Sequence, residues 1–141
     1  MDYCNVVLAG LPQRELDRVQ SVVNAAACLS ADARMYDHVL HVKPLLMDLH
    51  WLRVPERVKF KLCVLMHRCL TGAARRYLTE LAVPVASTAH RRLRSVSSAD
   101  LVVPSTRRST IGDRAFAVAG PRAWNSLPSD IRTSCTIIRH L

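Results

Sequence analysis

The sequence predicts a mainly helical protein, with a small helical bundle over residues 12–81 and an irregular C-terminal part that holds short helices and a candidate β-ribbon. Three observations predict this fold. Apolar residues recur at helical spacing in residues 16–27, a proline and a glycine frame a second helix at 55–72, and the composition changes from residue 82. At 141 residues, with 5% aromatics, the chain can bury a core made largely of aliphatic side chains and alanine.

The first predicted helix covers residues 12–29. Its apolar residues are spaced three and four apart, which places them on one side of a helix. They are Leu16, Val19, Val22, Val23, Ala26 and Ala27. A polar break follows over residues 30–37, and Pro44 is suited to start a short helix that runs toward Trp51, because proline fits the first helical position.

The second predicted helix lies between Pro55 and Gly72, and the chain is organised around it. Pro55 suits a first helical turn, and Gly72 suits the left-handed residue that follows a helix. From Phe60 onward apolar residues cover nearly every face, which indicates a helix surrounded by other elements. We therefore expect the core to be anchored by Trp51, Phe60, Leu62, Leu65 and Trp124.

After this helix the predicted elements are short. A helix over residues 73–81 should turn Tyr77, Leu78 and Leu81 inward, which completes the segment 1–81. Residues 82–100, rich in Val, Ala, Ser and Arg, are longer than an ordinary connection and are predicted to form a basic flexible loop.

Residues 101–141 are predicted to form a small mixed segment of the same domain. The β-branched residues 101–103 and the weakly alternating residues 115–118 could pair as a ribbon, with residues 106–112 as the connection. Residues 121–127 should form a helical turn that buries Trp124. The sequence thus predicts one domain with a helical first part and an irregular second part.

The formal charge of +9 is unevenly distributed. Up to Leu52 there are four Lys and Arg against six acids, whereas from Arg53 onward there are sixteen against five. Such asymmetry is typical of proteins that contact a polyanion, most often nucleic acid. A basic surface also binds acidic proteins, and both interpretations stay open on charge alone.

Candidate nucleic-acid-binding residues follow from the position of this charge. On the central helix Arg57, Lys61 and Arg68 fall within about 40° of one another, and they could follow a phosphate backbone without reading sequence. The complete candidate set is Arg57, Lys61, Arg68, Arg75, Arg76, Arg91, Arg92 and Arg94. Trp51 and Trp124 could stack on bases, but their apolar neighbours favour buried anchors.

No residue constellation predicts an enzyme, a metal site or a cofactor site. Polymerase chemistry needs paired aspartates for two metal ions, and the chain contains no adjacent pair of acids. Cys63 and Cys69 lie about 240° apart around the helix, so with His67 they cannot converge on one ion. A nucleophile elbow and a Walker loop are also missing from the sequence.

The cysteine content predicts an intracellular protein, cytoplasmic or nuclear. The five cysteines show no disulfide-framework spacing, so we expect reduced thiols. The sequence also shows no signal peptide and no apolar run of the roughly 18 residues that a membrane span needs, so we expect no membrane partner.

Short pieces along nearly the whole chain add a resemblance. They are Asp2-Tyr3-Cys4-Asn5, Gly10-Leu11-Pro12, Leu16-Asp17-Arg18-Val19-Gln20, Leu49-His50-Trp51-Leu52, Phe60-Lys61-Leu62, Tyr77-Leu78, Leu93-Arg94-Ser95, Val102-Val103-Pro104, Thr106-Arg107, Gly112-Asp113-Arg114-Ala115-Phe116 and Pro121-Arg122-Ala123-Trp124-Asn125-Ser126-Leu127-Pro128. In this order they resemble the region that follows the reverse transcriptase domain in LINE-type, non-LTR retrotransposon polyproteins. The chain departs from that family at Arg53 and Pro55, where Leu-Pro-Val followed by polar residues is common.

The resemblance implies a noncatalytic C-terminal fragment of such a polyprotein. Its catalytic aspartates would lie upstream, and its partners would be the parent reverse transcriptase domain and the backbone of RNA or DNA. The alternative is a self-standing helical module whose basic surface binds an acidic protein.

Overall fold

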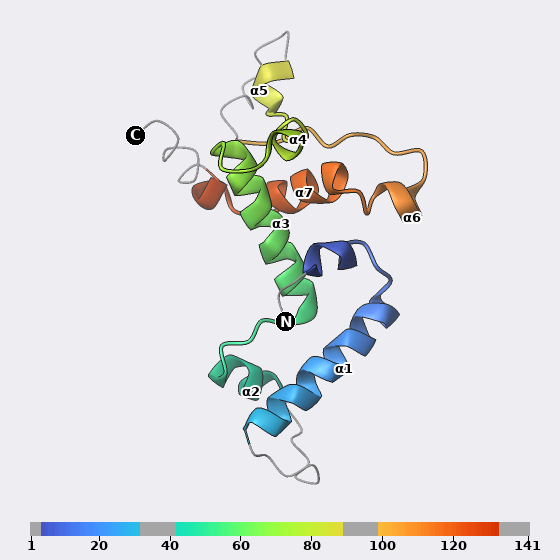
Figure 1. Cartoon of the computed structure of the whole chain (residues 1–141), viewed down its shortest axis with the longest axis vertical. Helices are drawn as coiled ribbons and strands as arrows, with labels where there is room; N and C mark the ends of the chain where they lie inside the picture. Colours follow the sequence, from blue (N-terminus) through green and yellow to red (C-terminus); the bar gives the residue numbers. More distant parts are fainter. Residues whose placement is uncertain (1–3, 32–41, 89–98, 133–141) are drawn as a thin grey trace. The chain divides into compact units, whose positions relative to one another are not determined.

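The computed structural model describes residues 4–31, 42–88 and 99–132, and in them the chain is mainly helical, as predicted (Figure 1). The elements are η1 (Asn5–Leu8), α1 (Gln13–Ser30), α2 (Val42–Asp48), α3 (Val54–Leu70), α4 (Arg76–Thr79), α5 (Val85–Thr88), α6 (Ser109–Gly112) and α7 (Phe116–Asn125). The chain divides into two compact units, Met1–Val58 and Lys59–Leu141. This boundary falls within α3, whereas the sequence predicted a single domain whose first segment ends at residue 81.

The first unit contains η1, α1, α2 and the first turn of α3. Its core joins α1 to α2 through Val23, Ala27 and Leu46, and Val54 completes it at the start of α3. The helix predicted over residues 12–29 is thus confirmed as α1. Its buried side is narrower than predicted, because Val22 points outward and is exposed.

A buried glutamine fixes the start of α3. The Oε1 atom of Gln20 accepts a hydrogen bond from the Val54 amide at 2.8 Å, and its Nε2 atom donates to Asn24 Oδ1 at 2.8 Å. The first amides of a helix have no partner within the helix, so α1 supplies one for α3. Glu56 adds a second bond of the capping-box type, accepting from the Arg53 amide at 3.2 Å.

The end of α3 is the one the sequence predicted. Gly72 adopts a left-handed φ of 75°, and a Cβ atom added there would meet no other atom within 4 Å. The chain then turns back, so that the Ala74 amide donates to the Arg68 carbonyl at 3.1 Å. This bond satisfies one of the carbonyl groups that a helix end leaves without a partner.

The second unit is built around Trp124, which is 1% exposed and packs against Met66, Cys69, Ala82 and Leu101. Figure 1 shows α7 lying across the C-terminal half of α3. This close approach depends on Gly120 of α7, because an added Cβ atom there would lie 2.6 Å from Met66 Sδ. The prediction that a helical turn buries Trp124 is confirmed, and the helix is longer than the predicted residues 121–127.

The predicted ribbon between residues 101–103 and 115–118 is wrong. Leu101 instead forms an isolated antiparallel bridge with Pro84, supported by the Val102 amide bonding to the Val83 carbonyl at 2.9 Å. Residues 116–118 are the first turn of α7, and Val118 and Trp124 of this helix are both buried. The segment predicted as loop also begins with a helix, α5, while residues 89–98 lie outside the described residues.

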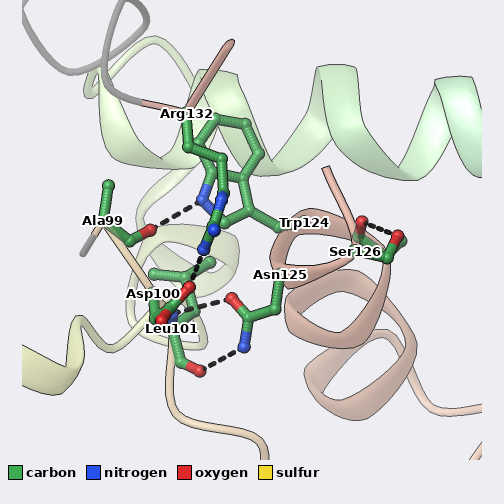
Figure 2. Close-up of polar contacts among 8 residues, drawn as sticks. Ala99, Asp100, Leu101, Trp124, Asn125, Ser126 and Arg132 are labelled. Atoms are coloured by element: carbon green, nitrogen blue, oxygen red, sulfur yellow. Dashed lines mark hydrogen bonds and ion pairs between the residues drawn. The ribbon is translucent and has the colours of Figure 1, made fainter. Parts of the chain in front are cut away.

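Side chains of α7 hold the extended segment 99–102 on its other edge (Figure 2). Asn125 accepts from the Leu101 amide at 2.9 Å and donates to the Leu101 carbonyl at 2.8 Å. Trp124 Nε1 donates to the Ala99 carbonyl at 3.0 Å, and Arg132 forms an ion pair with Asp100. An amide side chain therefore takes the place that a neighbouring strand would occupy in a sheet.

The expected core anchors divide into buried and exposed residues. Trp124 and Leu62 are buried, and Trp51 and Leu65 are partly buried. Phe60 is 55% exposed and is not an anchor in this structure, because two residues of helix turn it about 200° away from Leu62. In the predicted helix over residues 73–81, of which α4 is the observed part, Leu78 packs on the core and Tyr77 is exposed.

Candidate nucleic-acid interface

The positive charge of the chain belongs to one unit. Residues 59–141 contain fourteen Lys and Arg against four Asp and Glu, whereas residues 1–58 contain six against seven. The net excess of positive charge that could attract a polyanion therefore lies in residues 59–141.

Carboxylates in this unit are occupied by arginines of the same unit. Glu80 pairs with Arg76 at 3.1 Å, Asp113 pairs with Arg122 at 3.1 Å, and Asp100 pairs with Arg132. Each pair neutralises one acid and one base locally. The remaining basic residues of the unit therefore determine its electrostatic surface.

Asp113 organises the segment around α6. One of its oxygens accepts a hydrogen bond from Thr106 Oγ1 at 2.7 Å, and the other accepts from Arg122. The Thr106 bond, and after it the Arg122 interaction, lower the pKa of Asp113. Gly112 lies close to the same threonine, since an added Cβ atom would be 2.7 Å from Thr106 Cβ. These contacts attach residues 106–113 to α7.

Three exposed arginines lie close in sequence to the bonded residues Thr106 and Asp113: Arg107, Arg108 and Arg114. Among the described residues no carboxylate lies within ion-pair distance of any of them. They are not among the residues predicted from the sequence, although the adjacent pair Arg107-Arg108 in a polar stretch was a usable signal. Arginine presents a planar set of donors that matches a phosphate group, so this cluster is suited to backbone contact.

Seven of the eight predicted binding residues belong to the same unit, and the structure describes four of them. Arg68 of α3 and Arg75, the residue before α4, are exposed and have no acidic partner among the described residues. Lys61 is partly buried. Arg76 is exposed, but its Nε atom is paired with Glu80.

Arg57 differs from the rest of the predicted set because it lies in the first unit and serves structure there. Its Nε atom donates to the Leu52 carbonyl at 2.8 Å, and its guanidinium lies 5.9 Å from the centre of the Trp51 ring, within range of a cation–π interaction. Arg91, Arg92 and Arg94 lie outside the described residues.

Two cysteines of α3 have raised pKa values. Burial raises the pKa of the Cys63 thiol, against a smaller lowering by Lys59, and burial also raises the pKa of Cys69. Both therefore favour the neutral thiol, which is a poor nucleophile and a poor metal ligand. In residues 4–31, 42–88 and 99–132 no group of three His, Cys, Asp or Glu could hold a metal ion.

No helix in the described ranges combines the length and apolarity that a bilayer span requires. Comparison with known proteins adds no identification, because no protein-family model, curated protein or solved structure matches the chain. A functional proposal therefore rests on the chemistry of the surface.

Proposed function

We propose that this chain is a noncatalytic nucleic-acid-contacting protein that binds the phosphate backbone through the basic surface of residues 59–141. The observation that carries the proposal is the excess of positive charge in that unit, fourteen bases against four acids, with three of those acids already paired to arginines. The exposed bases of the unit include the Arg107, Arg108 and Arg114 cluster.

Binding of this kind is electrostatic and reads little sequence. Each phosphate that an arginine neutralises releases condensed counterions, so affinity falls as salt rises. Arg107, Arg108 and Arg114 are close in sequence and are attached to α7 through Asp113. An attached cluster loses less conformational freedom on binding than separate mobile arginines would lose.

The resemblance to the segment after a retrotransposon reverse transcriptase supports the same role. In that setting the chain would pack on the parent polymerase domain and help to hold template RNA or target DNA. The polymerase would supply the paired aspartates that this sequence lacks.

The test is binding of the full chain to a labelled single-stranded RNA and to a duplex DNA across a salt series. A triple variant, R107Q/R108Q/R114Q, removes three charges from the cluster. We expect the slope of log affinity against log salt for duplex DNA to fall by about 0.9 for each phosphate that the variant no longer neutralises. Circular dichroism on the same samples checks that both proteins are helical.

A matched control removes three charges from the other unit. The residues are Arg14, Arg18 and Lys43, all exposed or partly exposed, and each is changed to glutamine. The control should keep most of the affinity. Equal reductions in both triple variants would mean that net charge alone drives binding, and a folded chain that binds neither probe at low salt would overturn the proposal.

A further inference from the structure

A pocket of about 570 Å³ opens in the first unit, where the end of α2 meets the start of α3. Half of the eight described residues that line it are apolar: Leu46, Met47, Trp51 and Leu52. Its volume lies within the range of ordinary ligand sites, which are mostly apolar with a few polar groups. The proposed nucleic-acid surface belongs to the other unit and does not use this pocket.

Two of the apolar residues are at its mouth and are exposed. Met47 is 73% exposed and Leu52 is 45% exposed, whereas Leu46 below them is buried. Neither Met47 nor Leu52 belongs to the buried core of this unit. Methionine, tryptophan and arginine are enriched at protein interfaces, and this pocket brings Met47, Trp51 and Arg53 together.

The charge around the pocket is positive. Lys43 and Arg53 contribute two cations, and among the described residues no carboxylate lies within ion-pair distance of either side chain. Glu56 is the one acid among the described residues that line the pocket, and its carboxylate accepts a hydrogen bond from the Arg53 amide. The occupant that complements this arrangement is apolar in its centre and anionic at its edges.

The backbone of the pocket lining is strained at one residue. His50, in the pocket lining, adopts a left-handed φ of 53°. The turn it makes is closed by the Trp51 amide, which donates to the Leu46 carbonyl at 2.7 Å. Glycine would adopt this conformation at lower cost, and such strain is concentrated at functional sites.

We propose that this pocket binds an acidic peptide segment of a partner protein, with a bulky apolar side chain inserted between Met47 and Trp51 and flanking carboxylates beside Lys43 and Arg53. A nucleic acid satisfies the charge, and its bases could stack on Trp51, but its polar sugar-phosphate backbone does not match the aliphatic lining of Leu46, Met47 and Leu52. The peptide satisfies both.

Fluorescence anisotropy of the full chain with a labelled peptide tests this. The probe has Phe and Leu flanked by Glu and Asp, and a second probe replaces Phe and Leu by Ser while keeping the acids. We expect saturable binding of the first probe and at least about tenfold weaker binding of the second, since it has no apolar anchor. The double variant K43E/R53E should weaken the first probe by about tenfold or more.

A matched variant reverses two charges in the other unit, R107E/R108E. It should leave peptide binding within about twofold of the unchanged chain, with circular dichroism as the folding control for both variants. Equal binding of the two probes, or an affinity that K43E/R53E leaves unchanged, would overturn the proposal.

Two other occupants give distinct results. In one result, a single-stranded oligonucleotide displaces the bound peptide equally well from the unchanged chain and from the R107E/R108E variant. This result would assign the pocket to nucleic acid. Self-association in sedimentation that K43E/R53E abolishes would assign it to a second copy of the chain. Either result would refute the peptide proposal while leaving the proposed function of residues 59–141 to its own test.

Discussion

In each of the two units, an amide side chain forms hydrogen bonds with backbone groups that have no other partner among the described residues, but at a different kind of backbone position. In the first unit the amide side chain of Gln20 satisfies the backbone at the start of a helix, and in the second the amide side chain of Asn125 satisfies both groups of Leu101 in an extended segment. Val54 needs an outside partner for its amide alone, because its carbonyl is paired within the helix. Leu101 needs two outside partners, one for its amide and one for its carbonyl. The extended segment has a neighbour on the Pro84 side, and the amide and carbonyl of Leu101 face the opposite side. The stability of the second unit should therefore depend more strongly on Asn125 than the stability of the first unit depends on Gln20.

The largest expected effect is that of Asn125→Leu. It removes both partners of Leu101, and each buried backbone group left without a hydrogen bond costs about 1–3 kcal/mol, so we expect a reduction of about 2–4 kcal/mol in the stability of the second unit. Chemical denaturation, followed by the fluorescence of Trp124, measures this change in the free energy of unfolding. The adjacent Ser126→Ala is the control, because the Ser126 hydroxyl is exposed and bonds only to the Ala123 carbonyl, and it should change stability by under about 0.5 kcal/mol.

Gln20→Leu should have a smaller effect in the first unit. Leucine keeps the volume but leaves the buried Val54 amide without its acceptor, at a cost of about 1–2 kcal/mol. Gln20→Glu retains an oxygen that can accept from Val54 and should recover part of the stability. Trp51 reports unfolding of this unit. If Gln20→Leu cost more than Asn125→Leu, the difference drawn between the two units would be wrong.

The two helix ends offer a paired test. Gly72 and His50 both follow a helix in a left-handed conformation, one in each unit. Gly72→Ala should destabilise the second unit by about 1 kcal/mol, and His50→Gly should stabilise the first by a similar amount. Thermal unfolding of the two variants should move in opposite directions. A destabilised His50→Gly would show that the imidazole contributes more to folding than the strain removes.

The smallest effect concerns pH and Asp113. Hydrogen bonds from Thr106 and Arg122 lower the pKa of this carboxyl in the folded state, so its contribution to stability is complete above the ordinary carboxyl pKa and is lost as pH falls through the lowered value. Asp113→Asn should therefore reduce the dependence of unfolding on pH in the acidic range. Denaturation of the unchanged chain and of the variant, from neutral to acidic pH, checks this prediction. Parallel curves of unfolding free energy against pH would exclude a role for Asp113 in the pH dependence.

Sequence reasoning predicted the features that are encoded locally. Pro55 and Gly72 gave the ends of α3, and the spacing of apolar residues gave α1. Sequence reasoning could not predict the hydrogen bonds of Gln20 and Asn125, because their partners are 34 and 24 residues away in the chain. The residues around Gln20 and Asn125 do not indicate these partners. Phe60 was misplaced for a related reason, since an apolar residue on a helix does not by itself show which face is covered.

The candidate site was predicted only in its general character. Charge asymmetry located the basic half of the chain, but the helical stripe divided, with Arg57 bonded to Leu52 in the first unit. The predicted set did not include Arg107, Arg108 and Arg114, although Arg107 and Arg108 are adjacent in a polar stretch. Their attachment to α7 depends on the bonds of Asp113 to Thr106 and Arg122, which the sequence does not show. Spacing along a helix predicts which residues share a face, while the pairing of charges depends on tertiary structure.

The extended segment beside α7 has a consequence for hydrogen exchange. Its Leu101 and Val102 amides donate to Asn125 and Val83, and the Val85 amide opposite donates to the Asp100 carbonyl at 3.0 Å. Exchange at Leu101 requires separation of this segment from Asn125 of α7, whereas exchange at Val102 and Val85 requires separation of residues 100–102 from residues 83–85. Both openings expose the core around Trp124, because Leu101 and Ala82 pack in it. Amides of an isolated extended stretch normally exchange quickly, but these three should exchange as slowly as the interior amides of α7. A short non-helical segment would then report the opening of a helical unit.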